Sequence, residues 1–152
     1  MLWPITSPPA EIPAGYKFGA PRTYRNGIHE GIDLGKYGEP VLAAESGVVT
    51  FAGQSPSLGG LMVYIKHNAG WETRYMHLKT SSILVKKGQR VAAGQQIGSV
   101  GKTGITSSAP HLHFEVLKDG KKIDPESVLG ALGLATVLLA AGVAWVVYKV
   151  VR

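Results

Sequence analysis

The sequence predicts a mainly β domain followed by a single apolar helix, and three observations support this prediction. Short β-prone runs separated by glycines fill residues 41–116. An uncharged, mostly apolar run of 21 residues extends from Val128 to Tyr148. Four of the five histidines fall into three short clusters, at residues 29–33, 75–78 and 111–115. The residues before the apolar run suffice for one hydrophobic core, and the absence of cysteine excludes disulfides and thiolate metal ligands.

Residues 1–28 are rich in proline, glycine and aromatic residues and show no sustained period. We expect them to form an extended lead-in that packs on the domain. The first residues lack a basic stretch followed by an apolar one, so they do not predict a secretory signal. The domain itself is expected to span residues 29–125.

The runs within this domain are rich in β-branched and aromatic residues and are bounded by turn-forming residues. Clear examples are Gly47–Phe51, Leu61–Ile65 and Thr73–Leu78. Many short strands with frequent turns predict a β-sandwich or a barrel. The dipeptide Gly-Gln recurs at residues 88–89 and 94–95, which indicates tight turns with glycine at positive φ.

The C-terminal segment begins with a helix-start signal, in which Asp124 is the N-cap and Pro125 occupies the first helical position. As a helix, the run from Val128 to Tyr148 would be about 31 Å long, close to the ~30 Å hydrocarbon core of a bilayer. We therefore expect residues 126–152 to form a transmembrane anchor helix with a short basic tail. A buried helix of the soluble core is the alternative.

Lysines at 118, 121 and 122 precede this run, and Lys149 and Arg152 follow it, so the positive-inside rule gives no orientation. Small residues, among them Gly130, Gly133 and Gly142, would give the helix a face for contact with a copy of itself or with another membrane protein.

The late histidine cluster lies in a run where polar and apolar residues alternate. His111, His113 and Glu115 alternate with Leu112, Phe114 and Val116. This period of two places both imidazoles on one face of a strand, where they can share a metal, or one can bind it while the other acts on a substrate.

His29 and Asp33 are four residues apart, but Gly31 and Gly35 argue against a helix. We expect a loop leading into a strand, from which Asp33 can turn toward the same metal. His77 is expected on a further alternating strand with Thr73 and Tyr75, facing the same cleft. A catalytic zinc takes about three protein ligands and keeps one position open for water, so these clusters predict a hydrolytic zinc site.

The formal net charge is +6, from 16 basic and 10 acidic residues. Such a balance favours attraction to an anionic polymer such as bacterial cell wall, with an ordinary basic surface as the alternative. The basic residues are scattered and no nucleic-acid motif is present, so nucleic acid is not expected as a partner.

Taken together, the motifs resemble one peptidase family. They are His29-x-Gly31-x-Asp33, Tyr75-Met76-His77-Leu78, and Gly101-Lys102-Thr103-Gly104 leading to Pro110-His111-Leu112-His113-Phe114-Glu115. Over roughly residues 17–125 the chain is similar to the M23 peptidases, the lysostaphin-type or LytM-type zinc endopeptidases. The resemblance implies an open antiparallel sheet, one zinc ion bound in a groove, and the peptide part of peptidoglycan as the substrate.

Carried over by position, the resemblance makes His29, Asp33 and His113 the zinc ligands and places His77 and His111 beside the open position as catalytic residues. Spacing alone does not decide which of His111 and His113 is the ligand. Zinc acidifies its water and polarises the scissile carbonyl, and a neutral histidine can take the proton of the water. We favour His111 as the base and His77 as the stabiliser of the oxyanion; the reverse assignment stays open.

The leading prediction is thus a zinc-dependent endopeptidase that hydrolyses peptide cross-links of bacterial peptidoglycan. A catalytically silent wall-binding or activator protein is the second hypothesis, and a structural membrane protein that only binds the wall is the third. All five site positions are filled, which favours the enzyme. From the short chain and its C-terminal anchor we predict that the protein lies in the membrane of a phage virion, where the enzyme acts during entry. A bacterial envelope, with the catalytic domain facing the wall, is the alternative.

Overall fold

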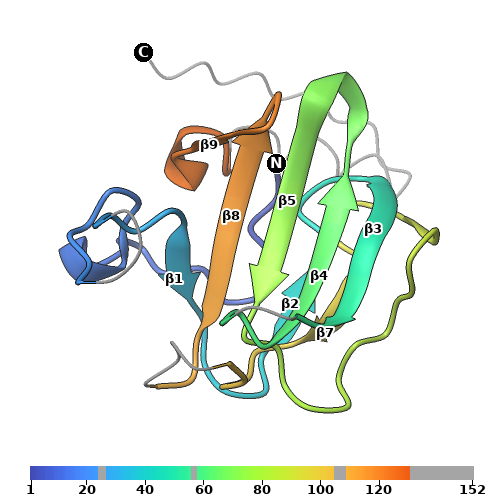
Figure 1. Ribbon diagram of the computed structural model, residues 1–152, viewed down its shortest axis with the longest axis horizontal. Coiled ribbons are helices and arrows are strands. Elements are labelled where there is room, and N and C mark those ends of the chain that lie inside the picture. The colour runs from blue at the N-terminus through green and yellow to red at the C-terminus, as the bar shows by residue number, and fades with distance from the viewer. Residues whose placement is uncertain (24–26, 56–57, 105–108, 131–152) are drawn as a thin grey trace, which may run out of the picture.

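The computed structural model describes residues 1–23, 27–55, 58–104 and 109–130 (Figure 1). Seven strands form one antiparallel sheet, in the order β1-β8-β5-β4-β3-β6, with β9 also paired to β8. Their bounds are β1 Ile32–Leu34, β3 Gly47–Gln54, β4 Leu61–Lys66, β5 Trp71–Met76, β6 Arg90–Val91, β8 Leu112–Lys118 and β9 Lys121–Ile123. The strands β2 (Pro40–Leu42) and β7 (Gln96–Ser99) form a second, two-stranded sheet.

The large sheet is open, because its path ends at β1 and β6 without closing. The mainly β, antiparallel fold that the resemblance implied is confirmed, whereas the barrel that strand spacing alone suggested does not form among the described strands. Both end strands are short, three residues in β1 and two in β6. Short edge strands offer few free backbone groups to a further strand.

The two faces of the sheet differ in chemistry. Leu112, Phe114 and Val116 of β8 are fully buried on the core face, as the alternation predicted. Tyr75 lies opposite Phe114 and is equally buried. His113 and Glu115 therefore project from the other face, which carries the site described below.

Glycine turns support the smaller strands. Gly88 and Gly94 have φ angles of 89° and 80°, as the repeated dipeptide predicted. In each turn the glutamine side chain accepts a hydrogen bond from a backbone N–H three residues earlier, that of Lys86 for Gln89 and that of Ala92 for Gln95. The short 3₁₀ helix η2 (Asn68–Gly70) connects β4 to β5 after His67.

The N-terminal lead-in packs on this sheet system. Ile5 bridges to Val41 of β2, and both Ile5 and Ile12 are buried in the hydrophobic core. The 3₁₀ helix η1 (Ala14–Tyr16) follows and makes contacts with β1.

At the other end, the expected helix start is present. The carboxylate of Asp124 accepts a hydrogen bond from the backbone N–H of Glu126 at 3.0 Å, and Pro125–Ser127 form the 3₁₀ helix η3. This helix stops there, because Val128 has φ −125° and Gly130 has φ +80°. Leu129 packs into the hydrophobic core.

The predicted anchor helix therefore does not include residues 128–130, and Gly130 cannot belong to its small face. Burial of Leu129 and the left-handed backbone of Gly130 tie this stretch to the domain. The remainder of the predicted span, with Gly133 and Gly142, lies outside the described residues. Within the parts of the chain that the structure describes, no helix is long and apolar enough to cross a bilayer.

Candidate metal centre and its groove

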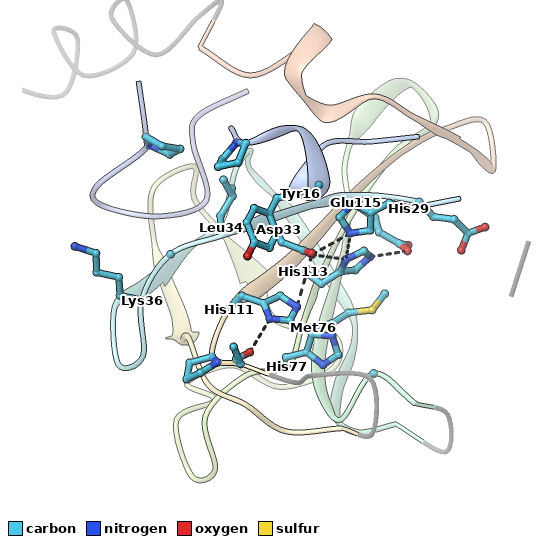
Figure 2. Close-up of a pocket in the computed structure, with 18 of the residues that line it drawn as sticks. Tyr16, His29, Asp33, Leu34, Lys36, Met76, His77, His111, His113 and Glu115 are labelled. Atoms are coloured by element: carbon cyan, nitrogen blue, oxygen red, sulfur yellow. Dashed lines mark hydrogen bonds and ion pairs between the residues drawn. The ribbon is translucent and has the colours of Figure 1, made fainter. Parts of the chain in front are cut away.

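Three side chains from two distant parts of the sequence converge at the junction of β1 and β8 (Figure 2). Asp33, in the middle of β1, lies directly opposite His113 of β8 in the strand register. His29 stands on the loop just before β1, as the sequence predicted. The Nε2 atom of His29, the Oδ1 atom of Asp33 and the Nδ1 atom of His113 are mutually 3.0 Å apart.

This triangle fits a metal ion. Ligand atoms about 2.0–2.1 Å from a tetrahedral zinc are separated by about 3.3–3.4 Å, so a slight outward movement would admit the ion. Two imidazoles and one carboxylate are also a donor set typical of catalytic zinc, which leaves one position for water or substrate.

Each histidine of the triangle is oriented through its second ring nitrogen. The Nδ1–H of His29 donates to the backbone carbonyl of Lys17 at 2.9 Å, which leaves its Nε2 lone pair facing Asp33. The Nε2 atom of His113 lies 3.2 Å from the Oε1 atom of Glu115, which leaves Nδ1 facing the triangle. Such outer partners fix the tautomer and direction of a ligand ring.

The electrostatics of the triangle follow from its contacts. Burial opposes ionisation of Asp33, but its close contacts with the rings of His113 and His29 hold the pKa of its carboxyl well below the usual range. Burial also opposes a charge on His113, yet hydrogen bonds to Asp33 and Glu115 raise the pKa of its imidazole to about 9. The site is therefore strongly polarised around one carboxylate.

Arg22 contributes a further charge that the sequence analysis missed. One guanidinium nitrogen, Nη2, lies 3.5 Å from Oδ2 of Asp33, the oxygen that faces away from the triangle, and donates to the carbonyl of Gly15 at 2.9 Å. The pattern around Arg22 is irregular, so no strand or helix period could have assigned it.

His77 reaches the site by a different route from the one predicted. The strand β5 ends at Met76, and His77 has φ +62°, in the left-handed region. A continued strand would have placed His77 on the core face with Thr73 and Tyr75, which are fully buried there. The left-handed turn instead brings His77 to the face that carries His113.

His77 and His111 lie side by side next to the triangle, with ring centroids 4.8 Å apart. The Nδ1–H of His77 donates to the carbonyl of Thr103 and that of His111 donates to the carbonyl of Ala109, both at 2.8 Å. Each neutral ring thus presents its Nε2 lone pair to the site. Nε2 of His111 is 3.6 Å from Oδ1 of Asp33.

The two flanking histidines differ in their surroundings. His77 is buried, and its pKa is lowered to about 4. The main cause is this burial, and the second cause is the nearby His111. His77 is therefore neutral at neutral pH. His111 is more accessible, with 21% of its side chain exposed, so it can exchange protons with solvent more readily.

A groove of about 710 Å³ runs over these five residues. One of its walls comes from the lead-in, where Tyr16 is 52% exposed, and from the loop before β1, where Ile28 is 46% exposed. Met76 and Pro110 also line it. The sequence analysis gave the lead-in only a packing role, because its residues carry no recognisable catalytic motif.

The structure thus brings together all five predicted site residues, His29, Asp33, His77, His111 and His113, in one groove. The arrangement can hold a divalent cation next to two imidazoles with free lone pairs. Such a combination suits the activation of water toward a carbonyl group.

The model of a protein family described as Peptidase family M23 matches residues 27–125. The peptidoglycan DD-endopeptidase ShyA of Vibrio cholerae is 42% identical over 105 residues, which cover 68% of this chain and 24% of ShyA. The murein hydrolase activator NlpD of Escherichia coli is 38% identical over 100 residues, which cover 65% of this chain and 25% of NlpD. The chain spans about a quarter of the length of these curated relatives.

Solved structures give the same result. A zinc-containing peptidase from Vibrio cholerae superposes with a TM-score of 0.67 at 36% identity, covering 80% of this chain and 37% of that chain. The catalytic domain of lysostaphin from Staphylococcus simulans superposes with a TM-score of 0.66 at 39% identity, covering 74% of this chain and 88% of that chain. These likenesses confirm the lysostaphin-type antiparallel fold.

Gly31 allows the close approach on which the triangle depends, so its replacement should disturb the site. A Cβ at this position would lie 2.4 Å from the carbonyl oxygen of Phe114 and 3.0 Å from the His113 ring. We expect Gly31→Ala to cost about 1–3 kcal/mol of stability and to weaken zinc binding by about 10-fold or more. Chelator competition and thermal unfolding measure the two effects.

Gly15→Ala serves as the matched control, because a Cβ there meets nothing within 4 Å. Equal zinc affinity in the Gly31→Ala and Gly15→Ala variants would contradict the prediction.

Proposed function

Because the chain belongs to peptidase family M23, we propose that it is a zinc-dependent endopeptidase that hydrolyses peptide cross-links of bacterial peptidoglycan. The observation that carries the proposal is the His29–Asp33–His113 triangle beside two further imidazoles in one groove. The relative ShyA, a peptidoglycan DD-endopeptidase, and the zinc-containing peptidase structure support the substrate class and the metal.

In this proposal His29, Asp33 and His113 hold one zinc ion. A zinc ion in such a site supplies a Lewis acid for the scissile carbonyl and lowers the pKa of the attacking water toward ~7. The carbonyl of Lys17 and the carboxylate of Glu115 keep the two ligand rings turned toward the ion.

His111 acts as the general base. Its Nε2 atom lies beside Asp33 and carries a free lone pair, because Nδ1–H is donated to Ala109. It takes a proton from the attacking water and later gives that proton to the leaving amine, and its partial exposure allows re-equilibration with solvent.

His77 stabilises the developing oxyanion. Its buried ring is neutral in the resting site, with Nδ1–H held by Thr103. Negative charge that grows on the carbonyl oxygen favours the protonated form of a ring so placed, so this interaction is stronger in the transition state than in the ground state.

A catalytically silent activator of other wall hydrolases is the second candidate. The relative NlpD of Escherichia coli is named a murein hydrolase activator, and this gives the alternative its support. The complete set of five site residues favours the enzyme, because an activator needs neither a ligand triangle nor a base.

Membrane anchoring belongs to the same proposal and rests on the uncharged run up to Tyr148. The segment beyond residue 130 crosses the membrane of a phage virion or of a bacterial envelope, with the domain facing the cell wall, and its small residues contact a copy of itself or another membrane protein. Because Leu129 is part of the hydrophobic core, the segment follows the domain directly, and the groove stays near the bilayer surface.

The metal prediction is one zinc per chain and cleavage of purified peptidoglycan. His113→Ala should lose most of the metal and all measurable turnover, because two ligands do not retain a catalytic zinc. Elemental analysis and mass spectrometry of the released fragments provide the readouts. A wild-type protein that binds zinc but releases no fragment, while stimulating another wall hydrolase, would support the activator instead.

The roles of the flanking histidines give a second prediction. His77→Ala and His111→Ala should keep the zinc and lose roughly 10²-fold or more in turnover. A base must be unprotonated, so activity is lost as pH falls through its pKa. If His111 is the base, this acid limb persists in His77→Ala and is lost in His111→Ala.

If His77 were the base, activity would continue down to about pH 4, because the pKa of His77 is lowered to about 4. An acid limb that stays at low pH in His111→Ala and vanishes in His77→Ala would reverse the assignment.

Truncation separates the anchor from the domain. A chain ending at Gly130 should remain folded, cleave peptidoglycan and stay in solution, whereas the full chain should float with lipid vesicles in a density gradient. A chain ending at Ser127 also lacks buried Leu129 and should lose about 2–3 kcal/mol of stability. Failure of the full chain to float, or unfolding of the chain cut after Gly130, would refute the anchor.

A further inference from the structure

We propose that Glu115 is a positioning residue for the metal site, acting through His113, and that Lys122 holds Glu115 in place. This inference rests on the proposed function in so far as the site binds zinc. It assigns a role to a set of charges, Glu30, Lys122 and Glu115, of which Glu30 and Glu115 line the groove. We call these three residues the carboxylate bridge.

The position of Glu115 is unusual for a carboxylate. Its side chain lies on the face of the sheet that carries His113, yet only 1% of it is exposed. Burial of a charge costs several kcal/mol unless close partners compensate it. Oε1 has two such partners, Nε2 of His113 at 3.2 Å and Nζ of Lys122 at 2.9 Å.

The other carboxylate oxygen is poorly compensated. Oε2 has no hydrogen-bond partner among the described residues, and its nearest cation is Nη1 of Arg74 at 3.8 Å. A buried acid with one unsatisfied oxygen is not a favourable device for stability alone. The contact at Oε1 indicates another role for the Glu115 carboxylate: it is an acceptor that favours the tautomer of His113 with the hydrogen on Nε2.

That choice of tautomer decides whether His113 can bind a metal. With the hydrogen on Nε2, the lone pair is on Nδ1, the atom 3.0 Å from both Asp33 and His29. Without an acceptor at Glu115, the ring can carry its hydrogen on Nδ1 and donate it to Asp33, which would block the metal. Outer partners of this kind typically contribute about 10- to 100-fold in metal affinity.

Lys122 connects the surroundings of both histidine ligands. It projects from β9, which pairs with β8 beyond the end of β1. Its ammonium group contacts Oε1 of Glu115 and also Oε2 of Glu30, at 2.6 Å. Glu30 follows His29 directly in the chain. The ammonium group of Lys122 therefore contacts both the loop that carries His29 and Glu115, the residue that orients His113.

The test measures zinc binding and ring tautomer in the full chain. Glu115→Leu should weaken zinc binding by about 10- to 100-fold in chelator competition. Glu115→Gln, which keeps an acceptor oxygen and nearly the same volume, should lose much less. Lys122→Met should fall between the wild type and Glu115→Leu, because Glu115 keeps its contact to His113 but loses its anchor.

Glu72→Gln is the matched control, since Glu72 pairs with Arg74 at 2.6 Å on the same face but has no contact with His113. It should leave zinc affinity unchanged. Thermal unfolding of metal-free protein shows whether each variant is folded.

The tautomer readout does not depend on zinc. The ¹⁵N signals of the His113 ring, recorded without metal at a pH alkaline enough to leave the ring neutral, should indicate a larger share of the hydrogen on Nε2 in the wild type and in Glu115→Gln than in Glu115→Leu. Glu115→Leu should shift the hydrogen toward Nδ1.

The outcomes separate the two proposals. Absence of zinc from the wild type, with the expected tautomer shift in Glu115→Leu, would refute the proposed function and retain the positioning role. A folded Glu115→Leu protein with wild-type zinc affinity and an unshifted tautomer would overturn the positioning role.

Discussion

The antiparallel pairing of β1 with β8 is the constraint on which the site depends. This pairing places Asp33 directly opposite His113, so the backbone ladder itself sets two of the three candidate ligands side by side. A slip of one residue would turn one of them to the core face. The fully buried Ile32 and Phe114, neighbours of these residues on the core face, resist such a slip. Hydrophobic packing under the sheet therefore maintains the chemistry above it.

Around this pairing, the protein orients its imidazoles mainly with backbone oxygens. His29, His77 and His111 each donate Nδ1–H to a carbonyl, from Lys17, Thr103 and Ala109 respectively. These acceptors are fixed as soon as the loops fold, and they cannot be titrated. His113 alone of the four relies on a carboxylate, which makes its orientation dependent on a set of side-chain charges.

How much of this site could be predicted from the sequence depends on how local each signal is. The alternation through His113 and the loop before Asp33 could be predicted from the sequence, because period and glycine content are local properties.

The backbone turn at His77 could not be predicted, since its left-handed φ occurs at a non-glycine residue. The backbone N–H of His77 donates to Gly59, and its ring donates to Thr103, two partners distant in the sequence. Arg22 and Lys122 were missed for the same reason, as their partners are known only once the strands are paired. The prediction that residues 128–130 belong to the anchor helix was wrong, because hydropathy does not distinguish a residue buried in protein from one buried in lipid.

The lead-in has a consequence for how such enzymes can diversify. The family match begins at residue 27, yet the carbonyl that orients His29 belongs to Lys17, and the exposed ring of Tyr16 forms part of the groove wall. The contact with His29 is made by a backbone oxygen, so the side chains of Tyr16 and Lys17 can vary without altering that ligand, whereas Arg22 contacts Asp33 through its own side chain. Exchange of these side chains between homologues would therefore change the groove wall without changing the groups that orient the metal ligands. The lead-in is thus a segment through which the specificity of the groove can change.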